Sequence, residues 1–84
     1  MNDKIMLFIK IPMIEEEINI LVPLTKKIGN VKEEIEKYIN EILPNSISKT
    51  PNMSLYDKET GKLIQNNLYI KNSNLTNGQT LILI

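Results

Sequence analysis

Apolar and polar residues alternate with a period of two in two segments near the start of the chain. Residues 4–11 place isoleucine or leucine at every odd position, and residues 17–22 place Ile18, Ile20 and Val22 on one face. This period is typical of β-strands. Proline follows each segment, at Pro12 and Pro23, and cannot donate to a sheet ladder. Only a short connection separates the two strands, so we predict a β-hairpin.

The period changes between Ile28 and Leu43. Apolar residues now recur at steps of three and four, which forms one stripe of an amphipathic helix: Ile28, Val31, Ile35, Tyr38, Ile39 and Ile42. Pro44 ends the predicted helix, because the residue before a proline avoids helical angles. Asn30 and Glu33 have the spacing of a capping pair, which would start the helix after Ile28. The pattern therefore leaves the first turn open.

The second half of the chain predicts short elements separated by turns. In order, they are a polar loop at 45–52, a strand at 53–57, a turn at 58–61 and a short strand at 62–64. Residues 66–74 are rich in asparagine and predict an irregular segment, with Leu68, Ile70 and Leu75 as inward anchors. An Asn77-Gly78 turn then leads to a final strand at 81–84.

This order of elements predicts an α+β fold. Eighty-four residues leave room for one core, so we expect a single domain spanning 1–84. One helix would pack across one face of a small mixed sheet of four to five strands. With the first and last strands adjacent and parallel, the strand order becomes 2-1-5-3, with a short fourth strand. This is the β-grasp arrangement.

The sequence resembles the ubiquitin-like β-grasp superfamily along essentially its whole length. Residues 30–35 are similar to ubiquitin's helix and residues 80–83 to its last strand. A closer resemblance is to the YukD/EsaB proteins, small ubiquitin-like proteins of low-GC Gram-positive bacteria. It rests on three matches: the strand end Leu21-Val22-Pro23, the segment Gly61-Lys62-Leu63-Ile64 with Leu68, and Asn77-Gly78 with Leu81. The resemblance implies an accessory component of a type VII (WXG-type) secretion system.

Composition excludes several classes of chemistry. The chain has no Cys or His, so it has no thiol nucleophile, no Ser-His triad and no zinc site of the usual ligands. We therefore expect no enzyme activity, catalytic residues, cofactor or metal. The formal net charge is zero and arginine is absent, so bidentate readout of guanine is impossible. Nucleic acid is not an expected partner.

The N-terminal residues carry no basic region followed by an apolar one, which argues against a signal peptide. No apolar run approaches the roughly 18 residues that a membrane-spanning helix needs. We therefore expect a cytoplasmic protein without direct membrane insertion.

The last residues bear on ubiquitin-type chemistry. Ubiquitin and the related sulfur carriers act through a flexible Gly-Gly tail, and here the sequence ends Leu83-Ile84 with no glycine nearby. Conjugation or sulfur transfer is therefore not expected.

Glu15, Glu16 and Glu17 form a run of adjacent carboxylates in the first hairpin. Such a run can serve as a metal site or meet a basic partner. It lacks other convergent oxygen ligands, so we interpret it as solvated surface.

The alternation of the strands separates a core face from an outer face. The predicted core residues are Ile5, Leu7, Ile9, Ile18, Ile20, Val22, Leu55, Leu81 and Leu83. Six of their sequence neighbours are apolar and would point outward: Met6, Phe8, Leu21, Tyr56, Ile82 and Ile84. A large exposed apolar patch usually marks an interaction site. We therefore predict that these six residues form a protein-binding face on the open side of the sheet.

The predicted partner is another protein, such as a component of the secretion system. Two alternatives remain open from the sequence. One is self-association of two copies through the same face, as a homodimer in an unrelated pathway. The other is ordinary apolar surface scattered among Lys4, Lys10 and Asn19.

Overall fold

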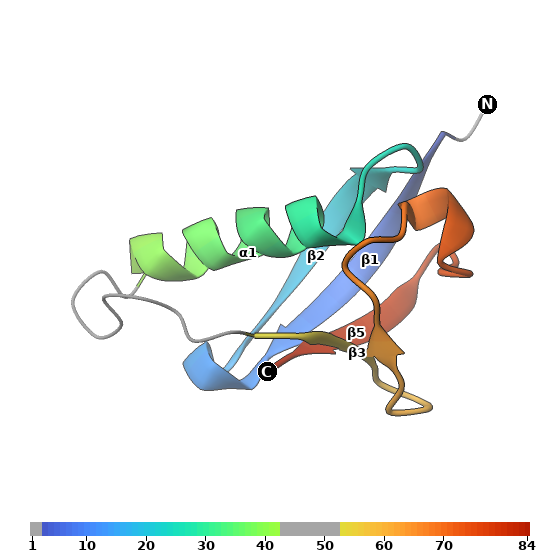
Figure 1. The fold of residues 1–84 in the computed structure, drawn as a ribbon. Helices are drawn as coiled ribbons and strands as arrows, with labels where there is room; N and C mark the ends of the chain where they lie inside the picture. Colours follow the sequence, from blue (N-terminus) through green and yellow to red (C-terminus); the bar gives the residue numbers. More distant parts are fainter. Residues whose placement is uncertain (1–2, 43–52) are drawn as a thin grey trace.

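The computed structural model describes residues 3–42 and 53–84 (Figure 1). Five strands and one α-helix follow each other in the predicted order: β1 (Lys4–Ile11), β2 (Glu16–Pro23), α1 (Ile28–Ile42), β3 (Leu55–Asp57), β4 (Leu63–Ile64) and β5 (Gln79–Leu83). Two short 3₁₀ turns, η1 (Pro12–Ile14) and η2 (Ile70–Asn72), lie in the connections. Pro44 and the loop predicted at 45–52 lie outside the described residues. Across both described ranges, no helix is long and apolar enough to cross a membrane.

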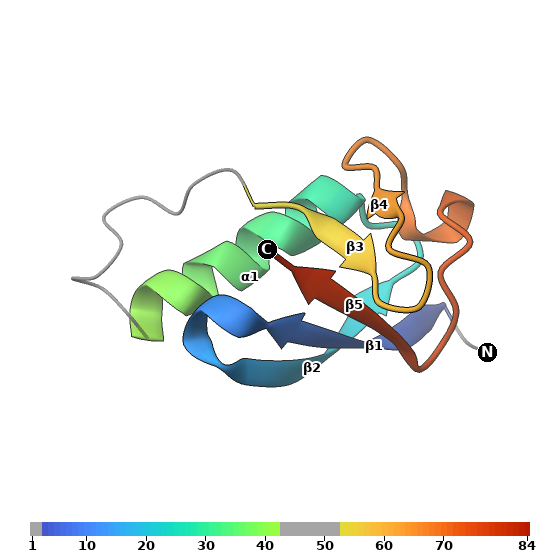
Figure 2. The same ribbon diagram turned by 90° about the horizontal axis from the view of Figure 1, so that it is seen from below.

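The strands form one mixed sheet in the order β2-β1-β5-β3-β4. β5 is parallel to β1, while β1 pairs with β2, and β3 with both β5 and β4, in antiparallel fashion. α1 crosses one face of this sheet, as the two views show (Figures 1 and 2). The prediction of an α+β, β-grasp fold with a short fourth strand is confirmed.

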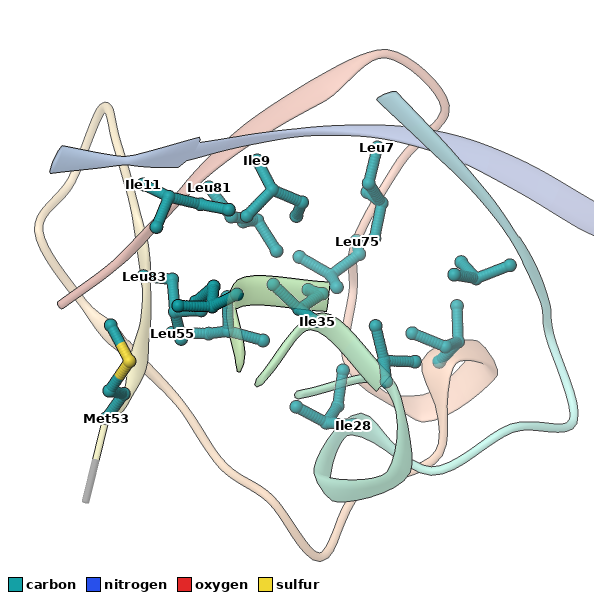
Figure 3. Packing of buried hydrophobic residues seen from close by; sticks show 14 residues of the cluster. Leu7, Ile9, Ile11, Ile28, Ile35, Met53, Leu55, Leu75, Leu81 and Leu83 are labelled. Carbon is teal, nitrogen blue, oxygen red and sulfur yellow. The ribbon is translucent and has the colours of Figure 1, made fainter. Parts of the chain in front are cut away.

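The core lies between α1 and the three central strands. Ile9, Ile11, Leu55, Leu81 and Leu83 are completely buried. They form one apolar cluster with the buried residues of α1, which are Ile28, Val31, Ile35 and Ile39. Figure 3 shows Ile28 and Ile35 of the helix within this cluster. The outer part of the predicted core is less enclosed: Ile5, Ile18 and Ile20 are only half-buried. No polar or charged residue of the described ranges is buried.

α1 begins at Ile28, ahead of the predicted Asn30–Glu33 capping pair. The amide of Ile28 donates to the carbonyl of Leu68 (2.9 Å), and the amide of Gly29 donates to the carbonyl of Asn66 (3.0 Å). The first amides of a helix need partners from outside it. Here the distant asparagine-rich segment supplies them, so capping from within the helix is not what sets its start.

The ends of two strands differ slightly from prediction. β3 begins at Leu55 rather than at residue 53, and β5 begins at Gln79, ahead of the predicted residue 81. Ser54 and Ile84 nevertheless exchange two backbone hydrogen bonds (2.8 and 3.1 Å), which continue the β3–β5 ladder. Both strands therefore exist where the alternation places them.

Candidate protein-binding face

Within the residues that the structure describes, α1 covers one side of the sheet and the other side has no helix over it. Figure 2 looks onto the opposite side, where the centre of the sheet lies in front of α1. We call this side the outer face. Side chains on it must be polar or find a partner, because one face of an antiparallel sheet is usually solvated.

Strand register brings most of the six predicted residues together. Met6 lies directly opposite Leu21 in the β1–β2 pair. Tyr56 lies opposite Ile82 in the β3–β5 pair. Phe8, two residues along β1 from Met6, lies opposite Thr80 and therefore stands between the two pairs. The apolar residues thus follow a diagonal across four strands.

Ile84 and Leu63 extend one end of this diagonal. Ile84 follows β5 and is 59% exposed. Leu63 lies opposite Tyr56 in the β3–β4 pair and is 55% exposed. The sequence prediction missed Leu63, although the alternation of Leu63-Ile64 in the short fourth strand could have placed it outward. We call the seven residues the outer band: Met6, Phe8, Leu21, Tyr56, Leu63, Ile82 and Ile84.

The residues of the outer band differ in how exposed they are. Leu21, Leu63 and Ile84 are more than half exposed, whereas Met6, Phe8, Tyr56 and Ile82 are half-buried by their neighbours. The most exposed residues therefore lie near the ends of the diagonal. The two aromatic residues are less exposed and lie between them. A binding partner would gain apolar contact along the whole diagonal.

Charged residues border the outer band. Lys10 lies opposite Glu17 on β2, and their side chains approach to 4.0 Å. Lys4 lies at the start of β1, and the amide of Lys58 donates to the carbonyl of Thr80 (3.2 Å), which holds Lys58 beside β5. These residues therefore comprise three lysines and one carboxylate, with Lys58 in the turn after β3. An exposed ion pair such as Lys10–Glu17 contributes little to stability.

A turn before β5 holds the Met6 end of the outer band. The amide of Met6 donates to Oδ1 of Asn77 (2.7 Å), and the amide of Gly78 donates to the carbonyl of Met6 (2.7 Å). Gly78 has φ of +87°, a conformation that glycine adopts without steric cost. The Asn-Gly pair is thus a turn, as predicted, and it also fixes β1 against β5.

Two titratable side chains have shifted pKa values. Hydrogen bonding from the Thr60 hydroxyl lowers the pKa of Asp57 below its usual value, despite partial desolvation. The hydrogen bond that Tyr38 donates to Oε1 of Glu16 (3.0 Å) raises the pKa of Tyr38. Tyr38 is exposed and Asp57 is half-buried, and each pKa shift has a local structural cause.

The described residues contain no group of three or more possible metal ligands placed to hold an ion. Glu15, Glu16 and Glu17 are all exposed, in the turn and the first residues of β2. The candidate site that the described residues present is the apolar outer band.

No protein-family profile matches the chain, and no curated protein sequence matches it. Solved structures do. A ubiquitin-like domain from Arabidopsis thaliana superposes with a TM-score of 0.68 over 99% of this chain and 78% of its own, at 20% identity. The fold is ubiquitin-like.

Other neighbours with this ubiquitin-like fold come from varied assemblies. A chain of the toluene 4-monooxygenase HD complex matches with a TM-score of 0.74 at 11% identity, covering 95% of each chain. A chain of the MycP5-free ESX-5 inner membrane complex matches with a TM-score of 0.73 at 11% identity, covering 99% of this chain and 21% of that one. At such low identities the likeness extends to the fold alone.

Proposed function

We propose that this protein is a non-catalytic ubiquitin-like interaction module, and that its outer face docks a protein partner. The observation that carries the proposal is the register of the sheet, which pairs Met6 with Leu21 and Tyr56 with Ile82 on the uncovered side. A folded partner could bury this diagonal in one continuous contact. Large apolar patches on soluble domains commonly serve such contacts.

Charge favours a different protein over a second copy. The outer face carries Lys4 and Lys10 on β1 and Lys58 beside β5, with Glu17 as the carboxylate on β2. A two-fold dimer through this face would set two surfaces of the same charge against each other, because each copy presents the same patch. Like charges brought together oppose association. We therefore propose a partner with apolar side chains bordered by carboxylates.

The proposed setting is the cytoplasm of a low-GC Gram-positive bacterium, as an accessory component of a type VII secretion system. Two observations support it. The sequence resembles the YukD/EsaB proteins in three short motifs: Leu21-Val22-Pro23, Gly61-Lys62-Leu63-Ile64 with Leu68, and Asn77-Gly78 with Leu81. In addition, one structural neighbour is part of the ESX-5 inner membrane complex. The partner proposed is accordingly a cytoplasmic or membrane-anchored component of that system.

A double substitution tests the outer face. Phe8→Glu with Ile82→Lys places two charges in the middle of the outer band and leaves the net charge unchanged. The matched control is Met13→Glu with Ile42→Lys, at apolar residues that are 40% and 37% exposed and lie in η1 and at the end of α1. Circular dichroism should show that both variants fold.

We expect pull-down of secretion components from the native host to succeed with the wild type and the control, and to fail with the Phe8–Ile82 variant. Retention of the partner by a folded Phe8–Ile82 variant would exclude the outer face. Sedimentation of the purified protein examines the alternative. A dimer that the same variant dissociates would replace the adaptor proposal with self-association.

A further inference from the structure

The turn before β5 contains the one place in the sequence where glycine follows asparagine, Asn77-Gly78. Asparagine is a chemically labile residue, and a following glycine has no side chain to shield its nitrogen. In a flexible chain that nitrogen attacks the side-chain amide carbon of the asparagine and closes a five-membered ring. Asn77 and Gly78 are both exposed. Apart from the chain neighbours, no atom of the described residues lies within 4 Å of where a Cβ on Gly78 would be, so solvent reaches the pair.

The structure nevertheless restrains both reacting groups through the backbone of one residue, Met6. The amide of Met6 donates to Oδ1 of Asn77 (2.7 Å), which holds the side-chain amide in place. The amide of Gly78 donates to the carbonyl of Met6 (2.7 Å), which engages the hydrogen that this nitrogen must lose before it attacks. Both distances lie at the short end of the range for N–H···O bonds. The two groups are thus bonded to β1 while the turn is closed.

A second pair of bonds closes the turn itself. The amide of Gln79 donates to the carbonyl of Thr76 (3.2 Å), and the amide of Thr76 donates to Oε1 of Gln79 (3.0 Å). The five-membered ring includes the backbone between Asn77 and Gly78. Its closure needs a rotation of this backbone that the bonds to Met6 and those across the turn oppose.

We infer that Asn77 is a self-modification site, at which the contact between Met6 and the turn holds back deamidation until the turn opens. On opening, the Gly78 nitrogen gives up its proton to base and attacks Cγ of Asn77. A bond from this nitrogen to Cγ replaces the Cγ–Nδ2 bond, Nδ2 leaves as ammonia, and a cyclic imide remains. Water then adds to one of the two imide carbonyl carbons and reopens the ring as aspartate or as isoaspartate. No oxidation or reduction takes place, and water is the co-reactant.

The two products affect the turn differently. Aspartate at residue 77 keeps a side-chain oxygen that can accept from the Met6 amide, so the contact between β1 and β5 can close again. Isoaspartate carries the backbone through the side-chain carbonyl and adds one carbon to the chain between residues 77 and 78. The lengthened turn then cannot keep both bonds to Met6. The modification therefore marks chains that have spent time open, and its isoaspartate product weakens the fold.

Mass spectrometry of the aged protein measures the reaction. The full chain is incubated in mildly alkaline buffer, either folded or in urea above its unfolding midpoint. Deamidation adds one mass unit, and chromatography of proteolytic fragments separates aspartate from isoaspartate at residue 77. We expect conversion at Asn77 to be at least about tenfold faster in urea, since the folded chain reacts only through its open state. The isoaspartate form, once purified, should have a lower urea midpoint than the aspartate form.

Hydrogen exchange measured by NMR gives an independent measure of opening. The Gly78 amide can neither exchange nor attack while it donates its hydrogen to Met6, so both reactions depend on the same opening. Folding should therefore slow deamidation at Asn77 by at least the factor by which it slows exchange at Gly78. A turn with only a structural role would not connect these two rates.

A pair of variants tests the closure of the turn. Gln79→Ala removes the acceptor of the Thr76 amide, and Gln65→Ala makes the same change at an exposed glutamine outside the turn. In the folded state we expect Gln79→Ala to deamidate faster than the wild type by roughly twofold to tenfold, the effect of losing one hydrogen bond. Gln65→Ala should match the wild type, and all three proteins should react at the same rate in urea.

Asn77→Gln identifies the reacting residue. Glutamine has one more carbon in its side chain, so the same attack would form a six-membered ring and is much slower. We expect the mass gain of the unfolded chain to slow sharply in this variant, and a gain at the wild-type rate would place the reaction elsewhere and overturn the inference. Three other results would also overturn it: equal rates at Asn77 in folded and unfolded protein, deamidation slowed less than exchange at Gly78, and equal rates for Gln79→Ala and its control when folded.

Discussion

Leu83 and Ile84 are adjacent residues that the structure assigns to opposite surroundings. Leu83 is completely buried and lies opposite Leu55 in the core, whereas Ile84 is 59% exposed on the outer face. Truncating each to alanine removes a similar amount of side chain. The two variants therefore isolate the effect of the side of the sheet on which a residue lies.

The expected costs differ severalfold. Truncating a buried leucine to alanine lowers the free energy of unfolding by about 2–5 kcal/mol, because apolar burial is lost and a cavity remains. Leu83 has no exposed surface and lies on a central strand, so we expect about 3–4 kcal/mol. Ile84 has already more than half its surface in water, and its truncation should cost about 1 kcal/mol or less. An 84-residue domain has a total free energy of unfolding of roughly 4–13 kcal/mol, so the Leu83 variant should lose a large part of it.

Urea denaturation followed by far-ultraviolet circular dichroism measures the difference. With a slope of about 1 kcal/mol per molar urea, the midpoint should fall by roughly 3 M for Leu83→Ala and by about 1 M or less for Ile84→Ala. Equal midpoints for the two variants would refute the assignment of alternate residues to core and outer face. A loss under about 1 kcal/mol for Leu83→Ala would refute the packing of β5 against α1.

Two further predictions concern pH. The hydrogen bond from Thr60 holds the pKa of Asp57 below its usual 3.8. The ionised Asp57 therefore contributes to folding stability above pH 3.8, and this contribution is lost as the pH falls through the lowered pKa. The urea midpoint of the wild type should therefore fall as the pH drops below about 4, and that of Asp57→Asn should fall less steeply. Parallel plots of midpoint against pH for the two proteins would contradict this. The bond to Glu16 raises the pKa of Tyr38 above 10.0, so its contribution is present below pH 10.0 and lost as the pH rises through the raised pKa. Ultraviolet titration should show one tyrosine that ionises at higher pH than the others, and Tyr38→Phe should remove it. If that tyrosine persists in the variant, Tyr38 is not the residue with the raised pKa.

Local patterns in the sequence were sufficient to predict the fold. The alternation of residues 4–11 gave β1 with its observed bounds, and the helical stripe gave Ile35 and Ile39 as core residues. These features depend on which face of an isolated element is apolar. The pattern does not fix the degree of burial, because Tyr38 and Ile42 of the same stripe are 36% and 37% exposed. The face containing Phe8 and Ile82 was predicted by the same alternation, and its role in binding stays a prediction.

Features that depend on distant segments were not predictable in this way. The helix begins at Ile28 because Leu68 and Asn66, far along the chain, accept its first hydrogen bonds. Leu63 belongs to the outer band because it lies opposite Tyr56. Its local signal is the alternation of Leu63-Ile64, but a strand of two residues has a defined face only when it pairs with its neighbour, here β3. The start of the helix has no signal within its own segment.

The central place of β5 has a consequence for how the domain folds. β1 and β3 make no ladder with each other, and each is bonded to β5, so the two halves of the sheet are joined through this single strand. Leu7 pairs with Gln79, almost the full length of the described chain away, and closing so long a loop is slow. An isolated two-stranded hairpin is at best marginally stable. We therefore expect slow, all-or-none folding, in which the outer face forms only together with the rest of the sheet.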